Sequence, residues 1–231
     1  MLRGYFYGPQ REQLYVLIKL QHGERSILRE KEVYTALQEK KAEQSAESTG
    51  CVYMFPSPHE YLVVEEFGSD IRAYFNPNST ILIPNLKKLM STVATLHSFG
   101  FVHCDIKPAN VLVRVGAFGI VEFKLCDLDS ATAIGEEFPL GKFTKAWVSP
   151  EVYFCSLKLD PLRVSPAIDS YGLGLLIAGM LSADCQPSKM VLPADNDAEF
   201  IEVLSNQEKL NRLLECSLKP YYKPIVEMAC R

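Results

Sequence analysis

The chain has 231 residues, of which 48% are hydrophobic and 23% charged, a composition typical of globular proteins. This length permits one large hydrophobic core or two modest lobes. The net charge of −4 lacks the basic excess that favours nucleic acid or anionic membranes, so neither is an expected partner. The longest apolar run, at 173–181, is about half of a membrane span, and the first residues lack the apolar segment of a signal peptide.

The cysteine content indicates the compartment. The seven cysteines are an odd number, without C-x-x-C spacing or a nearby pair of histidines. This pattern predicts mostly buried free thiols rather than disulfides or a metal site, and therefore a reducing, cytoplasmic location. The oligomeric state is left open by the sequence.

The first elements are predicted to be two strands and a helix. Residues 13–20, QLYVLIKL, form a β-branched and aromatic run that predicts a buried strand. The aromatic triplet at 5–7 and the turn-like GPQRE after it predict a preceding strand and a hairpin. Between 26 and 44 the apolar residues recur at helical spacing, and Ser26 is a plausible N-cap.

A second hairpin is predicted before the pattern changes. The segments CVYMF at 51–55 and EYLVVEEF at 60–67 predict two antiparallel strands. After residue 67 the apolar spacing becomes mainly helical. We therefore expect an α+β protein with a small strand-rich lobe at 1–67 and a larger helical lobe at 68–231.

The predicted large lobe has helices around two short strands. Residues 84–100 have apolar positions at helical spacing and end in glycine, which favours a helix stop. Short strands are expected at 111–115 and 121–126, on either side of a turn that contains glycine. The segment 170–181 is apolar nearly all round and predicts a buried helix, and 197–218 predicts one or two amphipathic helices.

Five short motifs occur in a defined order along the chain. They are VLIK at 16–19, HCDIKPAN at 103–110, DLD at 127–129, VSPE at 148–151 and DSYGLG at 169–174. They resemble V-A-I-K, H-R-D-x-K-x-x-N, D-F-G, A-P-E and D-x-W-x-x-G of the protein kinase superfamily, over almost the whole chain. The resemblance implies a two-lobed kinase fold that binds ATP and Mg²⁺ between its lobes.

The resemblance also implies roles for individual residues of the second and third motifs. Asp105 would accept or orient the proton of the substrate hydroxyl. Asn110 would help to bind Mg²⁺, with Asp127 as the main metal ligand. Lys107 together with Thr144 is the pairing found in serine/threonine kinases.

For the small lobe the resemblance implies the nucleotide contacts. Lys19 would contact the α- and β-phosphates and pair with Glu30. Glu30 is preferred to Glu32 because apolar residues lie three, four and seven positions after it, as in family members. Val64 would precede the hinge, whose backbone, from Glu65 to Phe67, would bind adenine. The implied cofactor-binding residues besides Lys19 and Glu30 are Leu17, Val64, Glu65, Phe67 and Leu112.

The sequence departs from the family pattern at four places. The glycine-rich loop that covers the phosphates is missing, since only two glycines precede the strand at 13–20. Leu17 stands where a small alanine usually lies above adenine. Cys104 replaces the arginine of H-R-D, which argues against activation by phosphorylation in the activation loop. Leu128 and Asp129 replace Phe and Gly.

Two residues near the candidate site are expected to be structural. His103 would bond to backbone, and Asp169 would accept backbone hydrogen bonds from the loop that carries Asp105. Both ends of the chain look cut, with about 10–30 residues expected upstream and about 20–40 downstream. Glu151 would then lack its usual arginine partner, and the chain would be marginally stable.

The function predicted from these motifs is ATP- and Mg²⁺-dependent phosphorylation of serine or threonine in protein substrates. The alternative is a pseudokinase that acts as a binding module with little turnover. The missing glycine-rich loop and Leu17 favour the alternative, whereas the presence of Lys19, Asp105, Asn110 and Asp127 favours the enzyme. A small-molecule phosphotransferase would share the second motif, but VSPE and DSYGLG argue against it.

Overall fold

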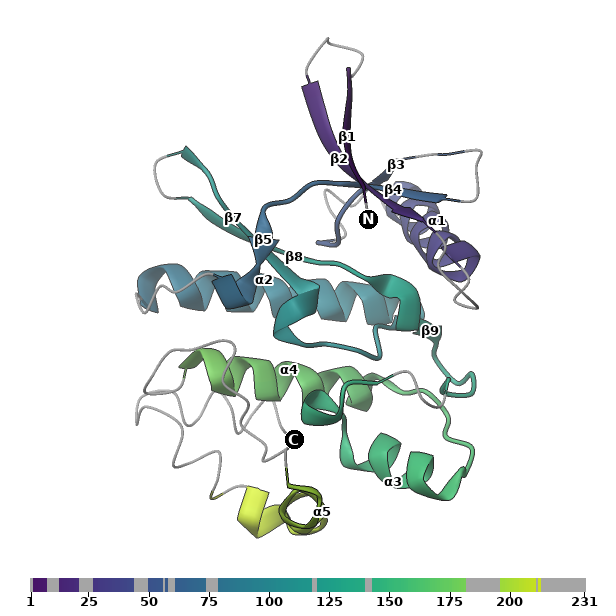
Figure 1. The fold of residues 1–231 in the computed structure, drawn as a ribbon, viewed down its shortest axis with the longest axis vertical. Coiled ribbons are helices and arrows are strands. Elements are labelled where there is room, and N and C mark those ends of the chain that lie inside the picture. Colours follow the sequence, from purple (N-terminus) through teal and green to yellow (C-terminus); the bar gives the residue numbers. More distant parts are fainter. Residues whose placement is uncertain are drawn as a thin grey trace.

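The computed structural model shows a strand-rich part above a helical part (Figure 1). This arrangement confirms the predicted two-lobed α+β class. The predicted hairpin loop at 8–12, the predicted N-cap Ser26 and most of the predicted helical segment after residue 210 lie outside the described residues. The structure describes residues 2–7, 13–20, 27–43, 50–55, 57, 61–73, 79–117, 120–139, 143–181, 196–210 and 212.

The small lobe contains a four-stranded antiparallel sheet in the order β1-β2-β4-β3. Its strands are β1 (Leu2–Tyr7), β2 (Gln13–Leu20), β3 (Met54–Phe55) and β4 (Tyr61–Glu65). The β1–β2 and β3–β4 pairings agree with the two hairpins predicted from the sequence.

Strand β3 is shorter than the predicted strand at 51–55. Cys51 forms a parallel bridge with Leu125, and the Val52 amide donates to the Leu125 carbonyl at 2.9 Å. The backbone at 51–52 is thus paired with a strand of the other lobe, which leaves two residues for the small-lobe sheet. A local pattern of apolar residues does not distinguish between these two partners.

Helix α1 (Ile27–Glu43) lies beside the small-lobe sheet (Figure 1). The predicted helical face is buried, with Ile27, Val33, Tyr34 and Leu37 at most 5% exposed. Glu30 belongs to the same face and is only 2% exposed. A buried carboxylate on an apolar face requires a partner, which the candidate site supplies.

The large lobe begins with small sheets that hold the connecting loops. Strand β5 (Ser69–Asp70), which was not predicted, pairs with β7 (Val111–Val115), and β7 pairs with β8 (Val121–Leu125). Strands β6 (Phe101–Val102) and β9 (Thr132–Ala133) form a separate two-stranded sheet. The 3₁₀ helices that the structure describes in full are η1 (Ile71–Ala73), η2 (Pro108–Asn110), η4 (Leu128–Ser130) and η5 (Lys145–Trp147).

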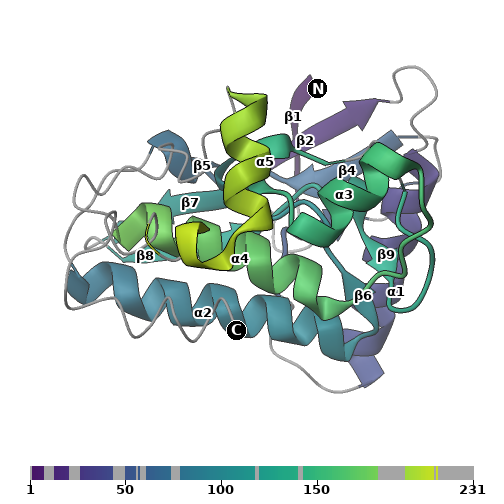
Figure 2. The same cartoon turned by 90° about the horizontal axis from the view of Figure 1, so that it is seen from below.

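Two long helices pack together in the large lobe, next to the short strands and 3₁₀ helices described above. Helices α2 (Ser79–Ser98) and α4 (Pro166–Leu181) run side by side (Figures 1 and 2). Helix α2 begins five residues before the predicted start, so that Pro84 lies inside the helix. Helix α4 is buried almost all round, as its composition predicted. Among the described residues, the remaining α-helices are α3 (Pro150–Lys158) and α5 (Asp197–Ser205).

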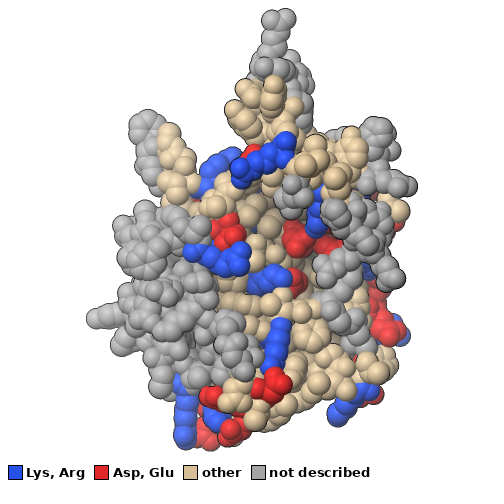
Figure 3. Space-filling view, in the orientation of Figure 1, with Lys and Arg blue, Asp and Glu red and all other residues tan. Residues whose placement is uncertain are grey.

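The surface carries charges of both signs. On the face drawn in Figure 3, blue and red side chains lie beside one another rather than in a large patch of one sign. Within the described part of the chain, no helix has the length and apolar character needed to cross a membrane. The described cysteines Cys51, Cys104, Cys126 and Cys155 are free, and the first two are buried.

Candidate active site

The loop after β6 holds Asp105 in a network of hydrogen bonds. Lys107 Nζ donates to Asp105 Oδ2 at 2.5 Å, and Asn110 Nδ2 donates to the same oxygen at 3.1 Å. Thr144 Oγ1 donates to Asp105 Oδ1 at 3.0 Å and accepts from Lys107 Nζ at 2.7 Å. The four side chains come from two segments far apart in the sequence. A carboxylate oriented in this way is suited to receive a proton from an approaching hydroxyl.

Asp169 holds the backbone of this loop from below. The buried Asp169 carboxylate accepts from the amide of His103 at 2.8 Å and from the amide of Cys104 at 2.9 Å. Cys104 has a φ of 66°, a conformation that costs energy for a residue with a Cβ. The two bonds stabilise this turn, in the structural role expected for Asp169.

His97 is a contributor that the sequence analysis missed. Its Nε2 lies 2.8 Å from Asp169 Oδ2, so the buried carboxylate has three polar partners. His97 lies in the last turn of α2, six residues before His103. A histidine at the end of an amphipathic helix resembles an ordinary C-terminal residue, so the sequence carried no specific signal for this contact.

A second cluster forms around Lys19 at the end of β2. Lys19 Nζ donates to Glu30 Oε2 at 2.7 Å and to Asp127 Oδ1 at 2.5 Å. The partner on α1 is thus Glu30, whereas Glu32 is exposed. Three elements from both lobes therefore meet at a single ammonium group.

Burial and charge shift the pKa values of this cluster in different directions. Burial alone would lower the pKa of Lys19, but the carboxylates of Glu30 and Asp127 outweigh it and raise the pKa above its ordinary value. Burial raises the pKa of Glu30 despite the opposing charge of Lys19. Burial would also raise the pKa of Asp127, but the charge and hydrogen bond of Lys19 lower it. Lys19 thus remains a cation over the physiological pH range.

Backbone contacts connect the two clusters. The Cys126 amide donates to the Asn110 carbonyl at 3.0 Å, and a His103 ring nitrogen lies 3.1 Å from the Cys126 carbonyl. Asp127 itself has a φ of 62°, in the left-handed region. The fully buried Leu128 follows it in η4. These contacts set the position of Asp127 relative to Asp105.

The oxygen donors here fit Mg²⁺ better than a metal that needs a complete protein cage. Among the described residues, no three His, Cys, Asp or Glu side chains are grouped to hold a metal. Asp127 is half-exposed and uses Oδ1 for Lys19, while Asn110 uses its amide nitrogen for Asp105. One carboxylate and one carboxamide oxygen, completed by phosphates and water, match the usual coordination of Mg²⁺.

The face of the small-lobe sheet that carries Lys19 also carries Leu17. Leu17 is directly opposite Val64 on β4, so the two side chains lie on one face of the sheet. On its other side Leu17 pairs with Arg3, whose Nε lies 3.1 Å from Glu66 Oε1. The expected adenine-facing surface therefore has an ion pair at its outer end.

The other predicted nucleotide contacts are spread over the connection between the lobes. The Glu65 carboxylate binds Lys124. Phe67 is fully buried, with Arg114 and Lys124 lying 4.3 Å and 4.6 Å from its ring centroid. Leu112 is partly buried on β7. Because the Phe67 side chain is in the core, only its backbone is suited to contact a ligand.

Comparison with known proteins agrees with this geometry. A family model described as "Protein kinase domain" matches residues 16–220. The chain is 29% identical over 160 residues to serine/threonine-protein kinase D3 of Homo sapiens, covering 66% of this chain and 17% of the relative. It is 28% identical over 130 residues to the glycogen synthase kinase-3 homolog YGK3 of Saccharomyces cerevisiae, covering 52% and 31%.

A third relative is serine/threonine-protein kinase PAK mbt of Drosophila melanogaster, 32% identical over 101 residues, covering 42% of this chain and 14% of the relative. In each of the three comparisons the matched part is less than a third of the relative's length. The family model, by contrast, spans most of this chain and includes all five sequence motifs. The chain therefore belongs to the protein kinase domain family.

Proposed function

We propose that this chain transfers the γ-phosphoryl group of ATP to serine or threonine hydroxyls of proteins in a Mg²⁺-dependent reaction. The observation that carries this proposal is the bonded set of Asp105, Lys107, Asn110 and Thr144, connected through the backbone at Cys126 to the cluster of Lys19. The set around Asp105 suits a hydroxyl acceptor, and the cluster around Lys19 suits phosphates. The reducing cytoplasm is the compartment that the cysteine pattern favours.

In the proposed reaction Asp105 orients the acceptor hydroxyl and takes its proton. A bond forms between the acceptor oxygen and the γ-phosphorus, and the bond from that phosphorus to the β–γ bridging oxygen breaks, so that ADP leaves. Lys107 lies within hydrogen-bond distance of Asp105 and Thr144, where a cation would stabilise charge on the transferred phosphoryl group. Lys19 would bind the α- and β-phosphates.

Bound Mg²⁺, held by Asp127 and Asn110, would neutralise phosphate charge. Lys19 contacts Asp127 directly in this structure. To bind phosphates, its ammonium group would have to contact phosphate oxygens in addition to the Asp127 carboxylate or in place of it. Glu30 keeps Lys19 at the end of β2 during that change of contacts.

A pseudokinase is the second candidate, and Arg3 gives a specific reason for it. Arg3 lies opposite Leu17 and is ion-paired with Glu66, so charge and bulk both border the expected adenine surface. A chain with this surface would keep the fold while binding nucleotide weakly. Its function would then be to bind other proteins.

The proposal is tested by incubating the purified chain with ATP, Mg²⁺ and a mixed peptide library. Mass spectrometry then identifies the modified residues. We expect phosphoserine and phosphothreonine, because Lys107 and Thr144 contact Asp105. Predominant phosphotyrosine would contradict the acceptor assignment, and the absence of any phosphopeptide would favour the pseudokinase.

A further inference from the structure

We infer that Arg29 and Glu136 are positioning residues that clamp the N-terminal end of α1 to the large lobe and so hold Glu30 against Lys19. The inference deepens the proposed function and rests on it for its catalytic meaning. It does not require any modification of the chain, since both groups are charged as they stand.

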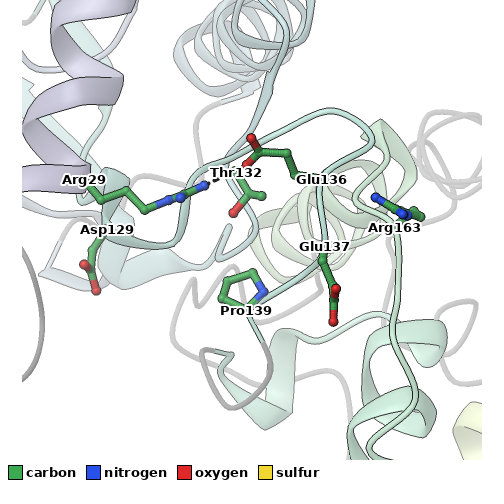
Figure 4. A pocket seen from close by; sticks show the side chains of 7 residues that line it. All are labelled: Arg29, Asp129, Thr132, Glu136, Glu137, Pro139 and Arg163. Carbon is green, nitrogen blue, oxygen red and sulfur yellow. Dashed lines mark hydrogen bonds and ion pairs between the residues drawn. The ribbon is translucent and has the colours of Figure 1, made fainter.

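The clamp bridges the two lobes on the side of α1 that faces the segment after β9. Arg29 Nη2 donates to Glu136 Oε2 at 3.0 Å. Figure 4 shows Arg29 reaching across from α1 to Glu136, and both side chains line a pocket of about 400 Å³. Arg29 is the residue immediately before Glu30, so the ion pair acts on the turn of helix that supplies the Lys19 partner.

Glu136 belongs to a segment that is itself fixed in the large lobe. The Gly135 amide donates to the Val164 carbonyl at 2.8 Å, and the Val164 amide donates to the Glu136 carbonyl at 2.8 Å. Arg163, the residue before Val164, donates from its guanidinium to the Gly135 carbonyl at 3.0 Å. Glu136 is therefore presented from a paired backbone rather than from an isolated loop.

The other end of α1 is also tied to the large lobe. Lys40 Nζ donates to the Phe99 carbonyl and lies 5.5 Å above the ring of Phe101. If α1 turned relative to the large lobe, this contact would hold its C-terminal end and serve as the pivot.

Glu30 lies far from Lys40 along α1, so a small rotation of the helix about Lys40 displaces Glu30 considerably. For this reason the weak ion pair of Arg29 with Glu136 can affect the position of Glu30. Glu30 lies about 15 Å from Lys40 along the axis, at 1.5 Å per residue. A rotation of about 10° around the pivot would move Glu30 by about 2.6 Å, enough to break its 2.7 Å contact with Lys19. Arg29 is 48% exposed and Glu136 57% exposed, so the pair adds little to global stability. Its effect is on the orientation of α1.

Charge reversal is the appropriate test because it can be undone by a second change. We would compare the wild type with Arg29→Glu, Glu136→Arg and the double variant, measuring amide hydrogen exchange at residues 31–36 without nucleotide, together with ATP affinity. The matched control is the ion pair between Glu202 on α5 and Lys209 after it, whose side chains are 63% and 39% exposed. Helix α5 lies at the opposite end of the molecule from α1 (Figure 1). The members of this control pair are reversed singly and together.

Each single reversal at the clamp should speed exchange at 31–36 by about fivefold, and the double reversal should return it to within about twofold of wild type. ATP affinity should weaken and recover in parallel, while the melting temperature stays within about 2 °C. Reversals at the control pair should leave exchange in α1 unchanged. Unchanged exchange in the single variants, or no recovery in the double variant, would overturn the inference. If the wild type does not bind ATP, the proposed function fails, and the exchange rates alone still decide whether the clamp exists.

Discussion

The loop that carries Asp105 and the sheet face that carries Leu17 differ in how closely they keep the pattern of the kinase family. In the loop, the carboxylate, ammonium and amide groups occur at the family spacing and bond to one another. On the sheet face Lys19 is kept, but Leu17 adds bulk and Arg3 with Glu66 adds charge. The half around Asp105, which would handle the acceptor, is thus preserved. The half on the sheet, which would handle the nucleotide, keeps Lys19 but lacks the glycine-rich loop and has changed at the adenine-facing surface.

The physical reason lies in the kind of contact that each half needs. Asp105 must lie within hydrogen-bond distance of several donors at once, so a change in any of them leaves a polar group unpaired at a cost of about 1–3 kcal/mol. A packing surface such as that of Leu17 tolerates substitution with a smaller, graded loss. Substitutions are therefore expected to be tolerated on the sheet face more readily than around Asp105.

Removing the proton acceptor tests the preserved half and should have the largest effect. Asp105→Asn keeps the shape of the side chain but cannot take a proton from the acceptor. We expect phosphate incorporation to fall by about 1000-fold. The melting temperature should change by no more than a few degrees, because an amide retains part of the hydrogen bonding.

The exposed Asp160 supplies the control, since Asp160→Asn makes the same chemical change outside the network. It should leave incorporation unchanged. Wild-type activity in Asp105→Asn would show that another group receives the proton.

Removing the cation of the Lys19 cluster tests the ion pairs that Lys19 makes with Glu30 and with Asp127. In Lys19→Met, Glu30 loses its partner, and its pKa, already raised by burial, should rise further. An acid whose pKa is higher in the folded state than in the unfolded state makes stability fall as pH rises above the unfolded value. We expect the variant to be about 3 kcal/mol less stable than wild type at pH 8, with a smaller loss at pH 5.

Urea unfolding at the two pH values measures this loss. Replacing Glu30 by Gln in the same variant removes the ionisable group, so the extra loss at pH 8 should disappear. A pH-independent loss in Lys19→Met alone would mean that Glu30 is not the group responsible.

A substitution of Leu17, on the adenine-facing surface of the sheet, should have the smallest effect, and this effect is on ATP affinity. Leu17→Ala should tighten ATP binding by about fivefold, or about 1 kcal/mol, if the side chain crowds adenine. Calorimetry measures this change. Ile18→Ala, on the other face of β2, should lower stability without changing ATP affinity. Unchanged affinity in Leu17→Ala, with lower stability alone, would show that Leu17 only packs.

The sequence predicted elements whose pattern is local. Strand β2 has the predicted bounds, and α1 lies where apolar periodicity indicated a helix. Helix α4 contains the segment 170–181, which was predicted to be a buried helix because it is apolar nearly all round. Glu30 was preferred to Glu32 because kinase family members have apolar residues three, four and seven positions after this glutamate. The Glu30 carboxylate lies 2.7 Å from Lys19 Nζ in the structure. Periodicity identifies α1 because one face of this helix is buried.

Features that depend on contacts between distant segments could not be predicted. Strand β5 exists because two residues pair with β7, more than forty positions later. Cys51 pairs with Leu125 rather than continuing β3. Arg29 and Glu136 are ordinary surface charges in the sequence, and only the folded chain brings them together.

The most direct test of the central claim is ATP binding by the wild-type chain with and without Mg²⁺, measured by calorimetry and repeated with Asp127→Asn. We expect Mg²⁺ to tighten ATP binding by at least about tenfold in the wild type. This gain should be lost in Asp127→Asn, because Asp127 is the proposed metal ligand. Failure of the wild type to bind ATP, or equal binding with and without Mg²⁺, would contradict the proposed function.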